Sequence, residues 1–89
     1  MKLKRGEKYF VYIVKCAKGT FYTGSTNDIE KRIALHNSGK GAKYLRGRGP
    51  VNLVYVKGFK DRSSALKEEI RIKRLGRKKK EGMVKKYKA

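Results

Sequence analysis

Five side chains in this sequence are of the types that hydrolyse phosphodiester bonds: Tyr12, Tyr22, Arg32, His36 and Glu69. A carboxylate can hold a divalent cation, which polarises a phosphate and stabilises the leaving oxygen. An arginine can neutralise the charge that builds up on the pentavalent phosphate. A tyrosine or a histidine can position or deprotonate the attacking water. As a set, these residue types have the groups that hydrolysis of a phosphodiester requires.

Each of the five also has a structural explanation when it is considered alone. Tyrosine is common in strands, where its hydroxyl often lies at the rim of the sheet. A histidine beside the apolar stripe of a helix is more often a hydrogen-bonded structural residue than a catalyst. A carboxylate on a buried stripe is costly unless it is paired or binds a cation. Glu69 is therefore either half of a structural ion pair or a metal ligand, and the sequence leaves both open.

The two tyrosines lie on a predicted β-hairpin. Residues 8–16 are a dense run of β-branched and aromatic side chains, which predicts a buried strand, and residues 21–24 return as a short second strand. The turn between them contains Gly19, which can adopt a positive φ. Because alternate residues share a face of a strand, Tyr12 and its even-numbered neighbours are expected on one face of the sheet.

Arg32 and His36 lie on the first predicted helix, which should end at about Asn37. Asn27 and Glu30 are three residues apart and match a capping box, which predicts the start of this helix. Because Arg32 and His36 are four residues apart, they should project from the same side of the helix.

Glu69 lies on the second predicted helix, over residues 61–76, with Asp61 or Ser63 as its cap. The predicted apolar stripe of this helix consists of Ala65, Leu66, Ile72 and Leu75, with Ile70 alongside. Glu69 falls inside this stripe, whereas the neighbouring Glu68 is expected on the outer face. The contrast between the two glutamates singles out Glu69 as the unusual residue.

The rest of the chain supplies a loop, a strand and a tail. Residues 39–50 are rich in glycine and basic residues, and residues 51–58 predict a third strand. Residues 77–89 are a basic tail, for which a short helix and a frayed end both remain open. The order of the elements predicts one α+β domain over residues 1–89, with its core at about 9–76.

The charge balance predicts contact with nucleic acid. The 89 residues include 26 Lys plus Arg and only 7 Asp plus Glu, for a formal net charge of +19. Such a chain repels itself unless a polyanion neutralises it. Alternatives are a ribosome-associated protein, an anionic membrane surface or a Lys-rich thermophile surface, although thermophile surfaces usually balance Lys with Glu. Charge alone does not distinguish a binding protein from an enzyme.

The composition also bears on the compartment. The single cysteine, Cys16, excludes an internal disulfide and a cysteine-based zinc site. No apolar run approaches the roughly 18 residues that a membrane span needs. The first ten residues lack the apolar core of a signal peptide. We therefore expect a cytoplasmic protein without membrane contact, associated with the nucleoid through its charge.

The five residues stand in an order and at spacings that resemble the GIY-YIG nuclease superfamily. "FVY" at 10–12 and "YTG" at 22–24 occupy the places of the two signature triplets, with Phe10 and Thr23 as departures from them. The remaining matches are Arg32 within "STNDIEKR", His36 within "RIALH" and Glu69, rather than Glu68, within "ALKEEIRIK". The resemblance covers residues 9 to about 80.

The segment 36–55, "HNSGKGAKYLRGRGPVNLVY", is similar to the small stand-alone bacterial and archaeal, UPF0213-like members of the superfamily. These members are similar to the nuclease domain of the eukaryotic Holliday-junction resolvase catalytic subunit. The resemblance implies a three-stranded antiparallel sheet flanked by helices. It also implies a metal-dependent, structure-selective DNA endonuclease that acts on branched or single-stranded junction DNA in repair or recombination.

The resemblance further implies a role for each matched residue. Glu69 would bind one Mg²⁺ or Mn²⁺, and Arg32 would brace the scissile phosphate. Tyr12 would act as, or assist, the general base, while Tyr22 and His36 would position the water and the phosphate. Hydrolysis is expected to leave a 5′-phosphate.

Basic residues outside this centre are expected to hold the nucleic-acid backbone, with affinity that falls steeply with salt. They are Lys40, Lys43, Arg46, Arg48, Arg71, Lys73 and Arg74. A protein partner could supply specificity. The alternatives to an enzyme are a non-catalytic nucleic-acid-binding module with the same fold and a small basic protein associated with ribosomes or RNA.

Overall fold

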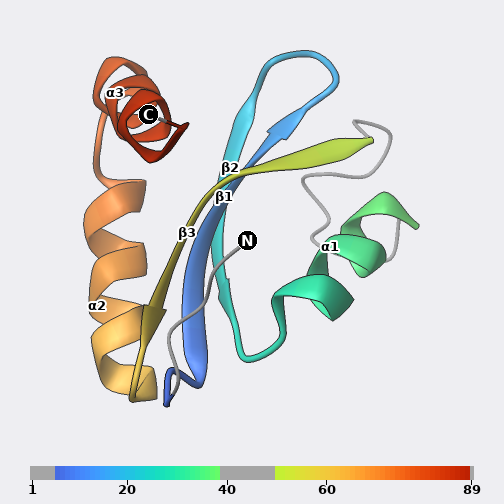
Figure 1. Cartoon of the computed structure of the whole chain (residues 1–89). Helices are drawn as coiled ribbons and strands as arrows, with labels where there is room; N and C mark the ends of the chain where they lie inside the picture. Colours follow the sequence, from blue (N-terminus) through green and yellow to red (C-terminus); the bar gives the residue numbers. More distant parts are fainter. Residues whose placement is uncertain (1–5, 39–49, 89) are drawn as a thin grey trace.

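The central element of the fold is strand β1, which pairs with a strand on each side. The computed structural model describes residues 6–38 and 50–88. Its elements are β1 (Tyr9–Cys16), β2 (Phe21–Thr26), α1 (Ile29–Asn37), β3 (Val51–Phe59), α2 (Arg62–Lys73) and α3 (Arg77–Lys88). The three strands form one antiparallel sheet in the order β2-β1-β3 (Figure 1). The α+β fold expected from the sequence is thus confirmed.

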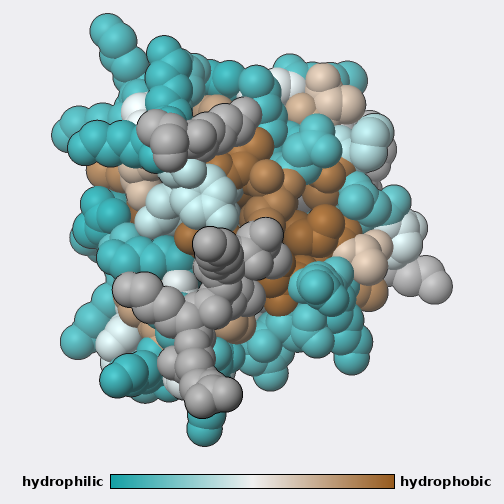
Figure 2. Space-filling view, viewed as in Figure 1, coloured by the Kyte–Doolittle hydropathy of each residue, from teal (hydrophilic) through white to brown (hydrophobic). Residues whose placement is uncertain are grey.

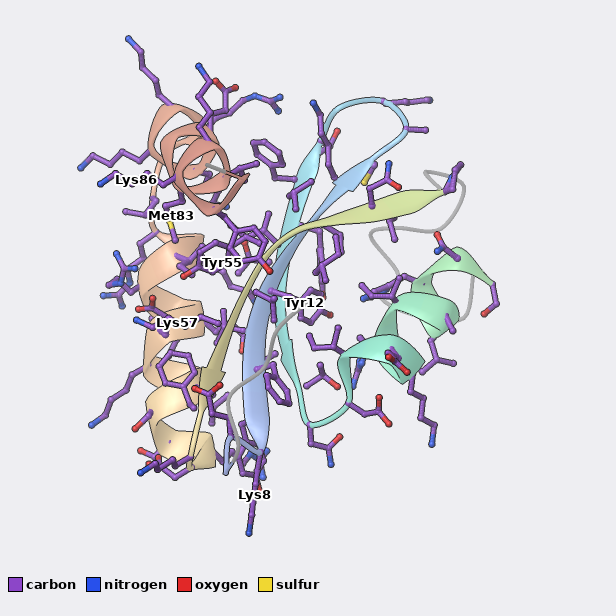
Figure 3. The ribbon with its side chains drawn as sticks, viewed as in Figure 1. Lys8, Tyr12, Tyr55, Lys57, Met83 and Lys86 are labelled. Atoms are coloured by element: carbon purple, nitrogen blue, oxygen red, sulfur yellow. The ribbon has the colours of Figure 1, made fainter. Side chains whose placement is uncertain are left out.

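The alternation of β1 distributes its side chains between two hydrophobic clusters, as the strand pattern predicted. On one face, Tyr12 packs with even-numbered neighbours and with Ile29 of α1. On the other face, Val11 and Ile13 pack with Ile72 of α2 and with residues of α3. Helix α1 therefore covers one face of the sheet, and α2 and α3 cover the other (Figure 1). Figure 3 shows the ring of Tyr12 on the α1 side.

The cap of α1 differs from the prediction. Asp28, and not Asn27, is the N-cap, and its side chain accepts a hydrogen bond from the backbone N–H of Lys31 at 3.1 Å. An aspartate is equally suited to this position, and its charge favours the positive end of the helix. The predicted end of the helix at Asn37 is confirmed. Helix α2 begins at the predicted cap Asp61, which accepts from the N–H of Ser64 at 2.7 Å.

The face that α2 turns to the sheet was only partly predicted. Ala65 and Ile72, seven residues apart, are buried there, and the side chain of Glu69 is only 14% exposed. Leu66 and Ile70 are 39% and 51% exposed, so their assignment to the buried stripe is wrong. The sheet-facing side of α2 is thus formed by Ala65 and Ile72, and the two larger side chains lie at its exposed side.

Glu68 also lies differently from the prediction. Its side chain is 13% exposed, so its expected place on the outer face is wrong. Arg71 donates two hydrogen bonds to its carboxylate, from Nε at 2.6 Å and Nη2 at 2.8 Å. Although burial opposes the shift, this pairing is the largest cause that holds the pKa of Glu68 below its usual range.

The basic segment after residue 76 forms a helix packed on the sheet. Val84 of α3 is buried in the same cluster as Ile72. The Arg77 guanidinium donates to the carbonyl of Gly19 at 2.9 Å and lies 4.9 Å from the centre of the Phe21 ring. The packed core therefore extends beyond residue 76, where the sequence predicted its end. Apolar residues of α3 pack against the end of the sheet that carries the β1–β2 hairpin turn.

One face of the molecule shows a group of apolar side chains (Figure 2). Figure 2 shows hydrophobic side chains gathered in the middle of one face and hydrophilic ones around them. In Figure 1, which has the same view, this region corresponds to the part of the molecule between β3 and α1.

Within the described ranges, no helix is long and apolar enough to cross a membrane.

Candidate active site

Tyr12 and His36 form the centre of the candidate site. The Tyr12 hydroxyl lies 2.9 Å from His36 Nε2, and both residues are almost completely buried. Tyr22, on β2, meets the His36 ring edge-on, with 5.6 Å between the ring centroids. The sequence placed these side chains on three separate elements, and the fold brings them into one aromatic cluster between the sheet and α1.

Both members of the Tyr12–His36 pair are held in their neutral forms. Burial, and then the positive charge of Arg32, lower the pKa of His36. Burial is also the main cause that raises the pKa of Tyr12 well above its usual value, with a further contribution from Tyr22. In the tautomer with its hydrogen on Nδ1, neutral His36 accepts the Tyr12 O–H at Nε2.

Gly24 makes room for this pair. Tyr12 and Gly24 are directly opposite each other in the β1–β2 ladder. A Cβ added at Gly24 would lie only 2.6 Å from the Tyr12 hydroxyl oxygen and 2.8 Å from Cζ. Because a side chain at this position would displace the phenol, the glycine of the second triplet is required by the position of Tyr12. The sequence identified this glycine only as part of a pattern.

Arg32 lies on the same helix as His36 and is partly exposed. It lines an open hollow beside the end of β2, together with Asn27 and Lys31. No carboxylate of the described residues forms a salt bridge with its guanidinium. Its charge lowers the pKa of Tyr12 as well as that of His36, so it acts electrostatically on both members of the pair. An arginine in this setting can bind a phosphate oxygen.

Glu69 reaches β2 from the opposite face of the sheet. Ser25 donates from Oγ to Glu69 Oε1 at 2.7 Å, and Lys73 Nζ lies 2.8 Å from Oε2. Burial raises the pKa of Glu69, but the hydrogen bonds from Lys73 and Ser25 together bring it below its usual value. The carboxylate is therefore ionised, and both of its oxygens are engaged.

The two halves of the site meet at the edge strand β2. Ser25 is paired with Val11, whose side chain faces α2, whereas Gly24 is paired with Tyr12, whose ring faces α1. Gly24 and Ser25 are neighbours on β2, and each contributes to the half of the site on a different face of the sheet. The Glu69 charge makes the smallest contribution to the raised pKa of Tyr12, after burial and Tyr22. Tyr12 is the point at which charges from α1 and α2 both act.

The donor set fits a hard divalent cation better than a zinc ion. In the part of the chain that the structure describes, no group of three or more His, Cys, Asp or Glu side chains could hold a metal. Mg²⁺ is commonly bound by one or two carboxylates together with waters and substrate phosphates. Glu69 offers one such carboxylate, already ionised and oriented by Ser25. It would hold the ion once Lys73 leaves Oε2.

Two open hollows flank the end of β2. One is lined by Tyr9, Ser25, Thr26, Asn27, Arg62, Ala65 and Leu66. The other contains Arg32, and the two share Thr26 and Asn27. Neither is lined by Tyr12, Tyr22, His36 or Glu69. The hollows therefore border the candidate site from its two sides, and each exposes one arginine.

The predicted nucleic-acid contacts are only partly placed by the structure. Lys40, Lys43, Arg46 and Arg48 lie outside the described residues. Arg71 and Lys73 are both paired with glutamates of their own helix, and Arg74 is the exposed C-cap of α2. Sequence reasoning missed Ser25, whose contact with Glu69 joins residues 44 positions apart. No local pattern marks that contact.

The fold and the site define a class of protein. The chain belongs to the family of the GIY-YIG catalytic domain, whose model matches residues 8–83. A UPF0213 protein of Oceanobacillus iheyensis is 52% identical over 71 residues, which cover 80% of this chain and 83% of that protein. A UPF0213 protein of Halobacterium salinarum is 48% identical over 75 residues, 84% of this chain and 97% of that protein. The resemblance found in the sequence is thereby confirmed.

Two solved structures share the fold. The solution NMR structure of a UPF0213 protein from Bacillus halodurans has a TM-score of 0.57 at 48% identity, covering 86% of this chain and 82% of the other. The solution NMR structure of the protein EF2693 from E. faecalis has a TM-score of 0.60 at 42% identity, covering 98% and 91%. The domain is therefore similar over nearly its whole length to separately solved bacterial proteins.

Proposed function

We propose that this protein is a metal-dependent DNA endonuclease that hydrolyses phosphodiester bonds in branched or single-stranded junction DNA. The observation that carries the proposal is the convergence on Tyr12. A neutral histidine is hydrogen-bonded to its hydroxyl, and the charges of Arg32 and Glu69 both act on it. Membership of the GIY-YIG catalytic domain family supports the same chemistry.

The Tyr12–His36 pair would activate the attacking water. Because the pKa of Tyr12 is raised, its phenol does not lose its proton to solvent near neutral pH. The phenol can instead pass its proton to His36 Nε2 while its oxygen takes a proton from the water. The proton then resides on His36, whose lowered pKa favours its return to the leaving oxygen.

Arg32 and Glu69 would deal with the charge of the phosphate. Arg32 would bind a phosphate oxygen from the α1 side, where the hollow beside it is open to solvent. A bound Mg²⁺ or Mn²⁺ would polarise the phosphate and stabilise the leaving oxygen. Glu69 would hold that ion from the α2 side, with Ser25 keeping its carboxylate in place.

The net charge of +19 accounts for affinity without sequence preference. Exposed basic residues lie on α2 and α3 as well as on α1, so backbone contacts are available on both sides of β2. A protein partner that selects the junction remains part of the proposal. Arg74, exposed at the end of the helix that carries Glu69, is a candidate for contact with the strand next to the cut.

The test is cleavage of labelled flaps, forks and four-way junctions in Mg²⁺ or Mn²⁺. Glu69→Gln should reduce the cleavage rate about 10²-fold or more, because the metal ligand is lost. The matched control is Glu68→Gln, since Glu68 is the neighbouring residue and is equally buried and ion-paired. Glu68→Gln should cut at the wild-type rate. Cleavage that survives Glu69→Gln would refute the assignment.

A second candidate function is non-catalytic nucleic-acid binding. It is favoured by the Lys73 ion pair, which occupies the carboxylate that a metal needs. This alternative predicts salt-sensitive binding that Glu69→Gln leaves unchanged and no cleavage of any substrate. Binding without cleavage across all the junctions and both metals would establish it over the endonuclease.

A further inference from the structure

The ion pair between Lys73 and Glu69 is unlike the other acid–base pair of α2. Lys73 Nζ lies 2.8 Å from Glu69 Oε2, four residues along the helix, while Ser25 of β2 holds Oε1. Glutamate four residues before lysine is the favourable orientation for a helical pair. The Lys73 side chain is half exposed, whereas the Glu69 carboxylate is largely buried. The ammonium therefore approaches the carboxylate from the solvent side.

This arrangement leaves one oxygen of Glu69 fixed and the other exchangeable. The Ser25 contact comes from the rigid strand β2 and orients the carboxylate. The Lys73 contact comes from a long, half-exposed side chain, which can leave the carboxylate without any movement of the helix backbone. A cation arriving from solvent would therefore compete with Lys73 for Oε2 and leave the Ser25 hydrogen bond in place.

We propose that Lys73 is a positioning residue that occupies the cation position on Glu69 until a divalent ion and DNA arrive. The inference rests on the proposed function, because it concerns the same carboxylate. When the ion takes Oε2, the Lys73 ammonium is released toward the exposed side of α2. There it binds a phosphate of the incoming strand. Lys73 thus links metal binding to DNA binding.

The link has a physical basis in charge. A largely buried carboxylate needs a positive partner, and Lys73 supplies one while the site holds no metal. A divalent ion replaces that single charge and repels the ammonium, which then needs an anion of its own. A DNA phosphate is the anion that arrives with the metal. Arg71, bound at both Nε and Nη2 to Glu68, is held by two hydrogen bonds and has no such role.

The first experiment measures Mn²⁺ binding without DNA, by the electron paramagnetic resonance signal of free Mn²⁺. The variants are Lys73→Met, Arg71→Met as the matched control, and Glu69→Gln. Lys73→Met lacks the competing ammonium, so this variant should bind Mn²⁺ about two- to fivefold more tightly than the wild type, which is the range of a solvent-accessible ion pair. Arg71→Met should bind as the wild type does, and Glu69→Gln should lose the site.

The outcomes separate this inference from the function on which it rests. If Glu69→Gln loses the site but Lys73→Met binds Mn²⁺ no more tightly than the wild type, the role of Lys73 is refuted alone. If Glu69→Gln binds as well as the wild type, Glu69 is not the metal ligand and both proposals fail. Lys73→Gln serves as a second neutral replacement if Lys73→Met does not fold.

The second experiment measures DNA binding to a labelled four-way junction in EDTA and in Ca²⁺, a hard divalent ion with oxygen ligands. In EDTA, Lys73 is paired with Glu69, so Lys73→Met should weaken binding only slightly, through the loss of one positive charge. In Ca²⁺, Lys73 is free to contact phosphate, so the variant should bind several-fold more weakly. Equal loss of affinity under both conditions would show a fixed phosphate contact and overturn the exchange.

Discussion

The two faces of the sheet are built by different means. The face under α1 carries a buried histidine, two tyrosines and a glycine that makes room for them. The face under α2 and α3 is filled mainly by aliphatic side chains, and the Glu69 carboxylate lies at its margin, against β2. Both faces bury apolar side chains, and the face under α1 depends in addition on the geometry of a hydrogen-bonded pair.

The difference shows how a chain of this size can stabilise a polar site. An 89-residue domain has a limited core, so buried polar groups are costly unless each is satisfied. Here Tyr12 and His36 satisfy each other within the apolar cluster under α1, and the aliphatic face under α2 and α3 supplies further apolar burial. Substitutions on the two faces should therefore affect different properties.

The largest loss of stability is expected on the aliphatic face. Ile72→Ala removes a side chain with no exposed surface and should lower the free energy of unfolding by about 2–5 kcal/mol. Ile70→Ala is the matched control on the same helix, and because Ile70 is largely exposed it should change stability by less than about 0.5 kcal/mol. Urea unfolding measures both. Similar values for the two variants would contradict the orientation of α2.

Gly24→Ala is expected to lose less stability than Ile72→Ala but more of the cleavage rate. The added methyl group displaces the Tyr12 ring, which should cost about 1–3 kcal/mol of stability. A displacement of the phenol from His36 should lower the cleavage rate about 10²-fold. The control is Gly82→Ala in α3, where the added methyl group meets nothing and should stabilise the helix by about 0.5–1 kcal/mol. Cleavage at the wild-type rate by Gly24→Ala would show that cleavage does not depend on the Tyr12–His36 contact.

The smallest effect is a pH dependence of stability that belongs to the α1 face. Burial and then Arg32 lower the pKa of His36 below its usual value of 6.5. The unfolded chain therefore binds more protons than the folded one as the pH falls below about 6.5, and the free energy of unfolding decreases until the folded pKa is passed. His36→Asn should show a smaller decrease between pH 7.5 and pH 5. An identical decrease would mean that other groups cause it.

Much of the fold was accessible from local patterns. The hairpin with Gly19 at its turn, the end of α1 at Asn37 and the Asp61 cap all depend on residues close together in the sequence. The inward orientation of Glu69 followed from its helical spacing to Ala65 and Ile72. Leu66, Ile70 and Glu68 were misplaced because the pattern gives the period of a helix but not how it is rotated against the sheet.

The residues of the candidate site could be selected from the sequence, but their arrangement in space could not. Tyr12, Tyr22, Arg32, His36 and Glu69 were selected by type and order, and the family resemblance followed from them. Ser25 was missed because a serine directly after a glycine has no distinctive pattern. Its role depends on β2 and α2 lying side by side, which is a property of the packed fold.

By itself, the sequence determined the three strands and the first two helices, the strong positive charge and the residues able to do chemistry, because these depend on composition and short-range spacing. The tertiary structure alone decided that Tyr12 and Glu69 approach β2 from opposite faces. It also decided that Gly24 makes room for the phenol and that Ser25 of β2 holds the Glu69 carboxylate. These relations join elements through strand register and helix packing, and a side chain's partner there depends on the whole fold.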